Sequence, residues 1–305
     1  MKIAICLVFF EDMTHLERLA KSLNALKHPD FKIYFLDNNP GKKHRERFQI
    51  LLPQSMEITC TENLGYAGGN NRIISQIQHE DYDAFWILNP DMAPEPDSLT
   101  ELATYMETDK QIFAAGPVIC LGETTDDPVI QLAGVKQDFF SQKKIHLHAG
   151  KKLKQLEIKI PFFTDSLNGG ALLVRAEMSK DKALFEEKYF MYNDETDLLY
   201  RIRLAKKLAC VVPAAVVFHH HDWSKGNRKG YFRMYYYMMR NKFLFWRKYN
   251  MYWPLFSGLM KEIILFPVIF SFCRRTAGRR LVLYYYKGIL DGLMNKSGKA
   301  TFEFI

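Results

Sequence analysis

Apolar and polar residues alternate along the first 120 residues in a pattern that predicts strands and helices in turn. Short apolar runs rich in β-branched and aromatic residues are typical of buried strands, and the stretches between them carry apolar residues at helical spacing. The predicted strands cover 2–10, 31–37, 56–63, 82–92 and 112–120, and the predicted helices cover 15–26, 70–79 and 96–106. This alternation predicts an α/β fold with a mostly parallel sheet and helices on both faces.

The pattern is less regular in the second half of the chain. Residues 121–165 suggest hairpins and loops, 168–177 resume strand character, and 189–207 run into a helix. The apolar stretch 209–218 is typical of a strand pair or of one bent strand.

Three polar features follow predicted strands, at the sheet edge where ligands of such folds bind. They are Asp37, the stretch TENLGYAGGNN at 61–71, and Asp91. The spacing of the glycines fits neither a phosphate-binding P-loop nor a dinucleotide fingerprint. Glycines let a backbone approach a ligand closely and asparagines supply amides, but a plain turn into a helix is an equal alternative.

Candidate metal ligands lie at the end of one predicted strand, and candidate bases lie at the start of one predicted helix. Asp91 offers a hard oxygen and Asn89 a carbonyl, which suit Mg²⁺ or Mn²⁺, although the same Asn-Pro-Asp turn could simply start a helix. Asp194 and Glu195 lie at a helix N-terminus, where one could act as a general base. The alternative is a solvated acidic end that favours the helix dipole.

Three consecutive histidines, His219–His221, follow the last predicted strand. In an extended segment successive side chains point to opposite faces, so at most two of them point the same way. One could bind a metal ion or a diphosphate. The alternative is a pH-sensitive surface loop.

The cysteines and the N-terminus exclude other classes. Five dispersed cysteines without a CxxC pair argue against a disulfide framework and a zinc knuckle, and they favour a reducing compartment. The N-terminal apolar run lacks a small-residue cleavage site and is interpreted as a buried strand.

The C-terminal part of the chain is basic and aromatic, and the net charge of the protein is +8. Such a segment favours a nucleic acid or an anionic membrane surface as partner. The charge-free runs 249–260 and 263–273 are each too short to span a bilayer. We expect helices lying on the membrane, with Trp246, Trp253 and nearby Arg and Lys as anchors. A private hydrophobic subdomain or a homodimer interface is the alternative.

The order of seven motifs resembles one family of enzymes. IYFLDNN, ENLGYAGGNN, WILNPDM, NGGALLVR, YFMYNDETDLLYR, FHHH and YYMMRN resemble, in this order, the inverting family-2 glycosyltransferases, above all the bacterial rhamnosyltransferase-like enzymes of surface polysaccharide synthesis. The resemblance covers roughly 1–245 and implies a GT-A fold. It would have a nucleotide-sugar half at 1–120 and an acceptor half at 121–245, followed by a C-terminal helical segment at 246–305.

The resemblance also implies roles for particular residues. Glu195 would be the catalytic base beside Asp194, and Asp91 the main metal carboxylate, because Asn89 stands where the family often has a first Asp. His219 or His220 would lie near the metal ion, Mg²⁺ or Mn²⁺, and the diphosphate. The remaining nucleotide-sugar contacts would come from Asp37, Asn63, Gly65, Gly68, Asn70 and Asn89.

The implied activity is transfer of a sugar, with rhamnose as the family-level expectation, from a dTDP- or UDP-sugar. The acceptor would be a glycan or an undecaprenyl-diphosphate-linked glycan, and the enzyme would be cytoplasmic and peripheral on the inner face of a bacterial membrane. A nucleotidyltransferase fits poorly because EDMTHLERL, after the first strand, lacks a glycine- and arginine-rich loop. A nucleic-acid-binding module fits poorly because long apolar runs interrupt the basic clusters. An inactive GT-A scaffold remains open through Asn89.

Overall fold

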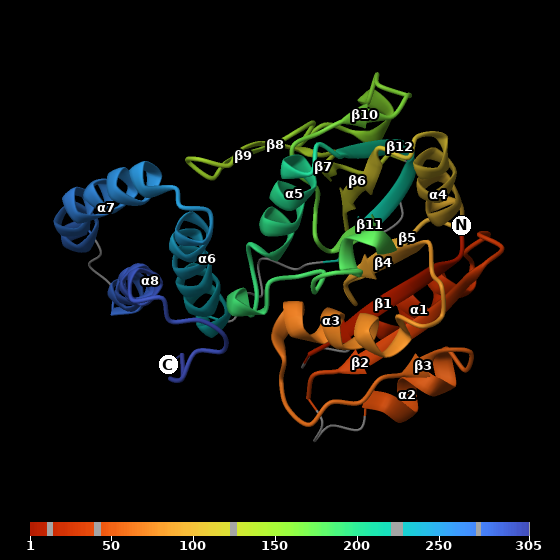
Figure 1. The fold of residues 1–305 in the computed structure, drawn as a ribbon, viewed down its shortest axis with the longest axis horizontal. Coiled ribbons are helices and arrows are strands. Elements are labelled where there is room, and N and C mark those ends of the chain that lie inside the picture. Colours follow the sequence, from red (N-terminus) through yellow and green to blue (C-terminus); the bar gives the residue numbers. More distant parts are fainter. Residues whose placement is uncertain (11–14, 40–43, 123–126, 221–227, 273–275, 305) are drawn as a thin grey trace.

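A central sheet of ten strands organises the molecule (Figure 1). The computed structural model describes residues 1–10, 15–39, 44–122, 127–220, 228–272 and 276–304. The main path of the sheet is β10 (Phe162–Phe163), β12 (Leu208–His219), β6 (Ile112–Leu121), β11 (Ala171–Arg175), β4 (Ala84–Leu88), β1 (Ile3–Phe9), β2 (Phe31–Asp37) and β3 (Met56–Glu57). Two further strands pair outside this path, namely β5 (Met92–Pro94) with β12 and β7 (Ile130–Leu132) with β6.

Most strands of the path run in one direction. The pairs β1–β2, β1–β4, β2–β3 and β6–β12 are parallel, whereas β11 runs antiparallel to both β4 and β6, and β10 antiparallel to β12. The predicted mostly parallel α/β fold is therefore confirmed. A separate antiparallel hairpin is formed by β8 (Val135–Asp138) and β9 (Lys143–His146).

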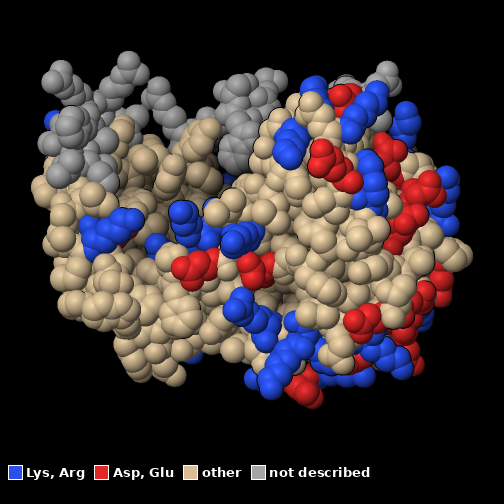
Figure 2. Space-filling view, turned by 90° about the horizontal axis from the view of Figure 1, so that it is seen from above, with Lys and Arg blue, Asp and Glu red and all other residues tan. Residues whose placement is uncertain are grey.

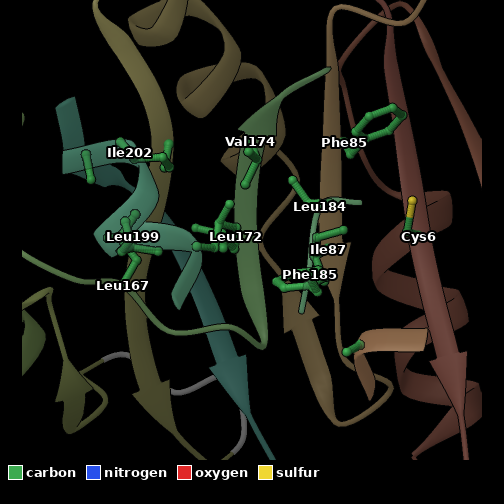
Figure 3. Close-up of a cluster of buried hydrophobic side chains, with 14 of the residues drawn as sticks. Cys6, Phe85, Ile87, Leu167, Leu172, Val174, Leu184, Phe185, Leu199 and Ile202 are labelled. Carbon is green, nitrogen blue, oxygen red and sulfur yellow. The ribbon is translucent and has the colours of Figure 1, made fainter. Parts of the chain in front are cut away.

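Helices cover both faces of the sheet because alternate strand residues point to opposite sides. Ile5 of β1 belongs to the core under α1 (Leu16–Asn24), α2 (His44–Leu51) and α4 (Ser98–Thr108). Cys6 belongs to the core under α3 (Gly65–Ile77) and α5 (Asp194–Leu204). Figure 3 shows part of this second core, where Cys6 and Ile87 lie across from Leu199. Short 3₁₀ helices lie at Leu153–Gln155, Ala176–Ser179 and Glu187–Tyr189.

The glycine-rich stretch is helical and not a loop. Helix α3 begins at Gly65, five residues before the predicted start, and β3 is limited to two residues. Two asparagines accept from amides that have no helical partner at this end: Asn63 Oδ1 accepts from the Gly65 amide at 2.8 Å, and Asn38 Oδ1 accepts from the Leu64 amide at 3.1 Å. Asn38 Nδ2 also donates to the Gly65 carbonyl at 2.8 Å. Helix α2 was not predicted, and 209–218 form one bent strand with a register shift between Val212 and Val216.

Three long helices follow the sheet. Helix α6 (Arg228–Lys248) packs along α8 (Thr276–Leu293), and α7 (Tyr252–Phe272) connects them. The backbones of α6 and α8 approach closely because Gly288 and Gly292 lack a side chain; a Cβ at Gly292 would lie 2.6 Å from the carbonyl oxygen of Arg240. The domain boundary expected at residue 245 falls inside α6. Within the described residues, no helix combines the length and the apolar character that a membrane crossing requires.

The two tryptophans predicted as membrane anchors lie in different environments. Trp246 is buried beneath Gly258 of α7, and its indole nitrogen donates to the carbonyl oxygen of Phe140 at 2.7 Å. The prediction for Trp246 is therefore wrong, because this side chain joins α6 to α7 and to the β8–β9 hairpin. Trp253 is 75% exposed on α7.

Replacing Gly65 by alanine should destabilise the protein strongly. Gly65 has a φ of +72°, and an added Cβ would overlap the carbonyl oxygen of Phe190. We expect the free energy of unfolding in urea to fall by more than about 3 kcal/mol, since backbone strain and steric overlap add. Gly150→Ala is the matched control, because Gly150 has a φ of +82° with open space around it and should lose only about 1–2 kcal/mol. Equal losses would show that the contact with Phe190 is unimportant.

Candidate functional site

The segment after β4 meets the end of β12. Asp91 Oδ2 lies 3.2 Å from His219 Nε2, and His219 Nδ1 lies 2.7 Å from Gln131 Oε1. Pairing of β5 with β12 fixes this contact, since Met92 lies opposite His219 and the His220 amide donates to the Asp91 carbonyl at 2.8 Å. The structure thus brings together two residues predicted as metal ligands that are 128 positions apart.

Asp91 and His219 fit a divalent cation. When Nδ1 donates to Gln131, Nε2 presents its lone pair toward Asp91, which is the tautomer that a metal ion requires. No group of three or more His, Cys, Asp or Glu that could hold a metal ion occurs among the described residues. Mg²⁺ and Mn²⁺ commonly bind to one or two protein ligands, with substrate phosphates completing the shell.

His220, the next histidine of the predicted trio, contacts α1 and the residue before it. The His220 ring hydrogen-bonds Arg18 of α1 and packs against His15 with ring centres 4.9 Å apart. His221 lies outside the described residues. The ring of His219 contacts Asp91, whereas the ring of His220 contacts Arg18 and His15.

The acidic pair at the start of α5 consists of two unlike carboxyl groups. Burial raises the pKa of Asp194 well above its ordinary value, and the nearby charge of Glu195 adds to this. Burial also raises the pKa of Glu195, but the ammonium of Lys144, 2.7 Å away, outweighs it and leaves this pKa lowered. Environments that push two carboxyl pKa values apart are typical of acid–base sites. Glu195 is the member of the pair that stays ionised, as a base requires.

Two glycines lie between Glu195 and the Asn89–Asp91 segment. The Gly170 carbonyl accepts from the Asn89 amide at 2.8 Å, and an added Cβ at Gly170 would lie 3.1 Å from Asn89 Nδ2. On the other side, a Cβ at Gly169 would lie 3.3 Å from Glu195 Cβ and 3.2 Å from the Tyr66 hydroxyl. Asn89 therefore lies against one side of the Gly169–Gly170 turn, and Glu195 lies against the other. In the sequence, this turn is marked by the two consecutive glycines before β11, which only the family resemblance singled out.

The predicted nucleotide-sugar residues divide into two groups. Asp37 and Asn63 are partly exposed at the edge of the sheet, and the Asp37 carboxylate accepts from the Asn39 amide at 2.9 Å. Gly65, Gly68 and Asn70 are buried in α3, where Asn70 Nδ2 donates to the Tyr66 carbonyl at 2.9 Å. The buried residues pack within the helix. Asp37 and Asn63 are better placed to contact a nucleotide sugar, and such contacts stay a prediction.

The turn before α5 is strained and is held by α6. Phe190, Tyr192 and Asn193 have φ values of 66°, 63° and 67°, a conformation that costs roughly 1–2 kcal/mol per residue. Asn241 Nδ2 lies 3.0, 2.7 and 2.9 Å from the carbonyl oxygens of Tyr189, Met191 and Tyr192. Arg240 donates to the Tyr189 carbonyl at 2.8 Å. We call these two fully buried side chains the Arg240–Asn241 clamp.

Two surface cavities lie away from this site. One of about 500 Å³ lies between α6, α7 and residues 186–189, and one of about 440 Å³ lies beside α3. Neither is lined by Asp91 or Glu195.

Comparison with known proteins identifies the family. Residues 4–169, more than half of the chain, match the model of Glycosyl transferase family 2. The chain belongs to this family. An N-acetylglucosaminyl-diphospho-decaprenol L-rhamnosyltransferase of Mycobacterium tuberculosis is 24% identical over 88% of this chain and 93% of its own length. The rhamnosyltransferase WbbL of Escherichia coli K12 is 25% identical over 68% of this chain and 80% of its own.

Solved structures confirm the expected GT-A fold. GalNAc-T7, crystallised with UDP, GalNAc and Mn²⁺, superposes with a TM-score of 0.62 at 14% identity over 81% of this chain, which spans about half of that chain (47%). Residues 1–349 of S. aureus TarS superpose with a TM-score of 0.56 at 10% identity, over 96% of this glycosyltransferase and 81% of the TarS chain. At these identities the likeness concerns the fold alone.

Removing the amide of Asn241 should loosen the turn that positions Glu195. Asn241→Ala removes this donor from the part-buried carbonyls of Met191 and Tyr192, each worth about 1–3 kcal/mol, and we expect the free energy of unfolding in urea to fall by about 2–4 kcal/mol. Glycosyl transfer should fall with it at temperatures where the variant is folded. Asn24→Ala is the control, since this exposed amide also donates to a carbonyl, that of Leu51, and should change stability by less than about 0.5 kcal/mol. A fully active, stable Asn241→Ala would contradict the role of the clamp.

Proposed function

We propose that this family 2 glycosyltransferase transfers a sugar, with inversion, from a nucleoside-diphosphate sugar to a hydroxyl of a lipid-linked glycan. The observation that carries the proposal is the Gly169–Gly170 turn, which has the ionised Glu195 on one side and the Asn89–Asp91 segment on the other. A base and a diphosphate-binding corner on either side of one turn are what an inverting displacement needs, since attack and departure occur on opposite faces of the anomeric carbon.

Glu195 would accept the proton of the acceptor hydroxyl. The acceptor oxygen then forms a bond to the anomeric carbon while the bond from that carbon to the diphosphate oxygen breaks, and the electron pair leaves with the nucleoside diphosphate. General base catalysis of this kind contributes about 10²–10⁴-fold to rate. Burial and the neighbouring Glu195 raise the pKa of Asp194, which would disfavour a second negative charge beside the hydroxyl.

Asp91 and His219 would hold Mg²⁺ or Mn²⁺ at the diphosphate. When bound, the ion supplies positive charge that stabilises the developing negative charge of the leaving group. The mutual position of the two side chains, and the Gln131 oxygen that can accept from His219 Nδ1, support this assignment. Asn89 contributes no charge, so a single carboxylate would hold the ion.

Rhamnose and a diphosphate-linked acceptor are the finer parts of the proposal. Both curated relatives are named rhamnosyltransferases, and one of them acts on an N-acetylglucosaminyl-diphospho-decaprenol. The alignment with that relative covers 93% of its length and 88% of this chain, which supports a similar acceptor.

A peripheral position on an anionic membrane is supported by α7. The helix exposes a row of large apolar side chains, Trp253, Phe256, Ile263 and Ile264, each between 52 and 75% exposed. Exposed basic residues, among them Lys261 and Arg280, accompany this row. Figure 2 shows that the surface over the C-terminal helices is largely uncharged, unlike the rest of the view. Apolar side chains flanked by basic ones are typical of helices that lie in a bilayer interface.

Two substitutions should separate catalysis from donor binding. Glu195→Gln should keep Mn²⁺-dependent binding of a dTDP- or UDP-sugar, measured by calorimetry, and lower kcat by about 10²–10⁴-fold because the base is lost. Asp91→Ala should lose the Mn²⁺ dependence of donor binding.

Asp97→Asn is the control, because this exposed carboxylate pairs with Lys27 on the surface and should leave both measurements unchanged. Normal turnover by Glu195→Gln would remove this residue from the mechanism. If neither class of nucleotide sugar binds the wild-type protein, the proposed function itself is wrong.

Membrane association should depend on the apolar row of α7. In sedimentation with phosphatidylglycerol vesicles, Trp253→Ser combined with Ile264→Ser should lower the partition coefficient at least about tenfold, since each buried side chain contributes about 1.5–3 kcal/mol. Ile50→Ser is the control, because Ile50 is 79% exposed on α2, on the opposite side of the molecule (Figure 1). Equal partition of all three proteins would exclude α7 as the anchor.

A further inference from the structure

The β8–β9 hairpin reaches from the sheet to the catalytic base. Figure 1 shows the hairpin extending past α5 toward the C-terminal helices. Its turn is attached there by two contacts: the Phe140 carbonyl accepts from Trp246 of α6 at 2.7 Å, and Gln142 Oε1 accepts from Asn193 at 3.0 Å. Asn193 is the N-cap of α5, two residues before Glu195. The turn of the hairpin is therefore fixed to the residue that precedes the helix carrying Glu195.

The hairpin and the loop after it are strongly basic. Between Lys143 and Lys154 the sequence KKIHLHAGKKLK contains five lysines and two histidines and no acidic residue. The exposed side chains of Phe140 and Ile145, 60 and 50% accessible, accompany this charge. A surface with this composition attracts an anion that carries apolar groups.

Lys144 forms an ion pair with Glu195 in this structure. The Lys144 ammonium lies 2.7 Å from Glu195 Oε1, and the two side chains are only 30 and 21% exposed. An adjacent cation favours the ionised form of a carboxylate and so makes it a weaker base. The pair therefore opposes proton transfer for as long as it persists. A substrate that takes the ammonium would restore the basicity of Glu195.

We propose that Lys144 binds the phosphate or diphosphate group of the acceptor, and that this contact releases Glu195 to receive the proton of the acceptor hydroxyl. The inference rests on the proposed function and names the residue that selects an anionic acceptor. The charge next to the accepting sugar draws the ammonium away, so the base becomes fully competent only when an acceptor of the right class is bound. A neutral glycoside leaves the ion pair in place.

The test compares two acceptors that share one sugar. The charged acceptor is N-acetylglucosamine linked through a diphosphate to a short prenyl chain, and the neutral one is an octyl N-acetylglucosaminide. For Lys144→Met we expect the KM of the charged acceptor to rise at least about tenfold, with the donor KM unchanged and transfer to the neutral acceptor faster, because the ion pair that opposes proton transfer is lost. Lys144→Arg should restore much of the preference for the charged acceptor, because it keeps the positive charge.

Lys143→Met is the matched control. Lys143 is the preceding residue of β9, points to the opposite face and is exposed, so its loss should not change the preference. Equal losses toward both acceptors, or no loss by Lys144→Met, would overturn the inference. Direct binding of the two acceptors, measured by calorimetry without donor, tests the same preference independently of turnover. Failure of the wild-type protein to transfer to either acceptor, with the binding preference intact, would count against the proposed function alone.

Discussion

The Arg240–Asn241 clamp is the constraint on which the catalytic region depends. Three residues of the turn before α5 adopt a left-handed backbone, and such a turn persists only when its surroundings hold it. The clamp supplies hydrogen bonds to the turn carbonyls from the interior of α6, where water cannot substitute for them. On the other side, the Tyr66 amide donates to the Phe190 carbonyl at 2.8 Å, so the same turn also positions the start of α3.

This arrangement ties the C-terminal helices to the chemistry. Helix α6 carries the clamp, packs on α8, and is further linked by Arg240 to the Gly298 carbonyl at 2.6 Å. Removing the residues after 245 would therefore expose the face of α6 that holds the turn, and would test stability more than membrane binding. The apolar face of α7 and Glu195, the proposed base, thus belong to one structural unit. A membrane-bound acceptor would meet both.

Local pattern was sufficient to predict β1, β2, β4, β6, β11 and β12, most helices and the fold, because the spacing of buried positions depends on a few neighbouring residues. It also placed Asp91 and Glu195 at element ends. It missed contacts between distant segments: the asparagines that start α3 at Gly65, the burial of Trp246, and the pairing of Lys144 with Glu195. Each of these depends on the tertiary arrangement, since an aromatic or a lysine has the same local signal on a surface or in a core.

The substitution of Asn89 for a family carboxylate has a consequence for how donor and metal ion bind. In the proposed site, one carboxylate and one imidazole would supply a weak, partial shell for a hard cation, and phosphate oxygens would complete it. Each ligand then raises the affinity of the site for the other by the same factor, because their coupling is reciprocal. The proposed role of Lys144 adds a similar dependence on the acceptor. Glu195 would become a stronger base only when the charged group of the acceptor binds Lys144. In such a site, both metal binding and the basicity of Glu195 would depend on bound substrate. The activated sugar would then be protected from hydrolysis until both substrates are bound.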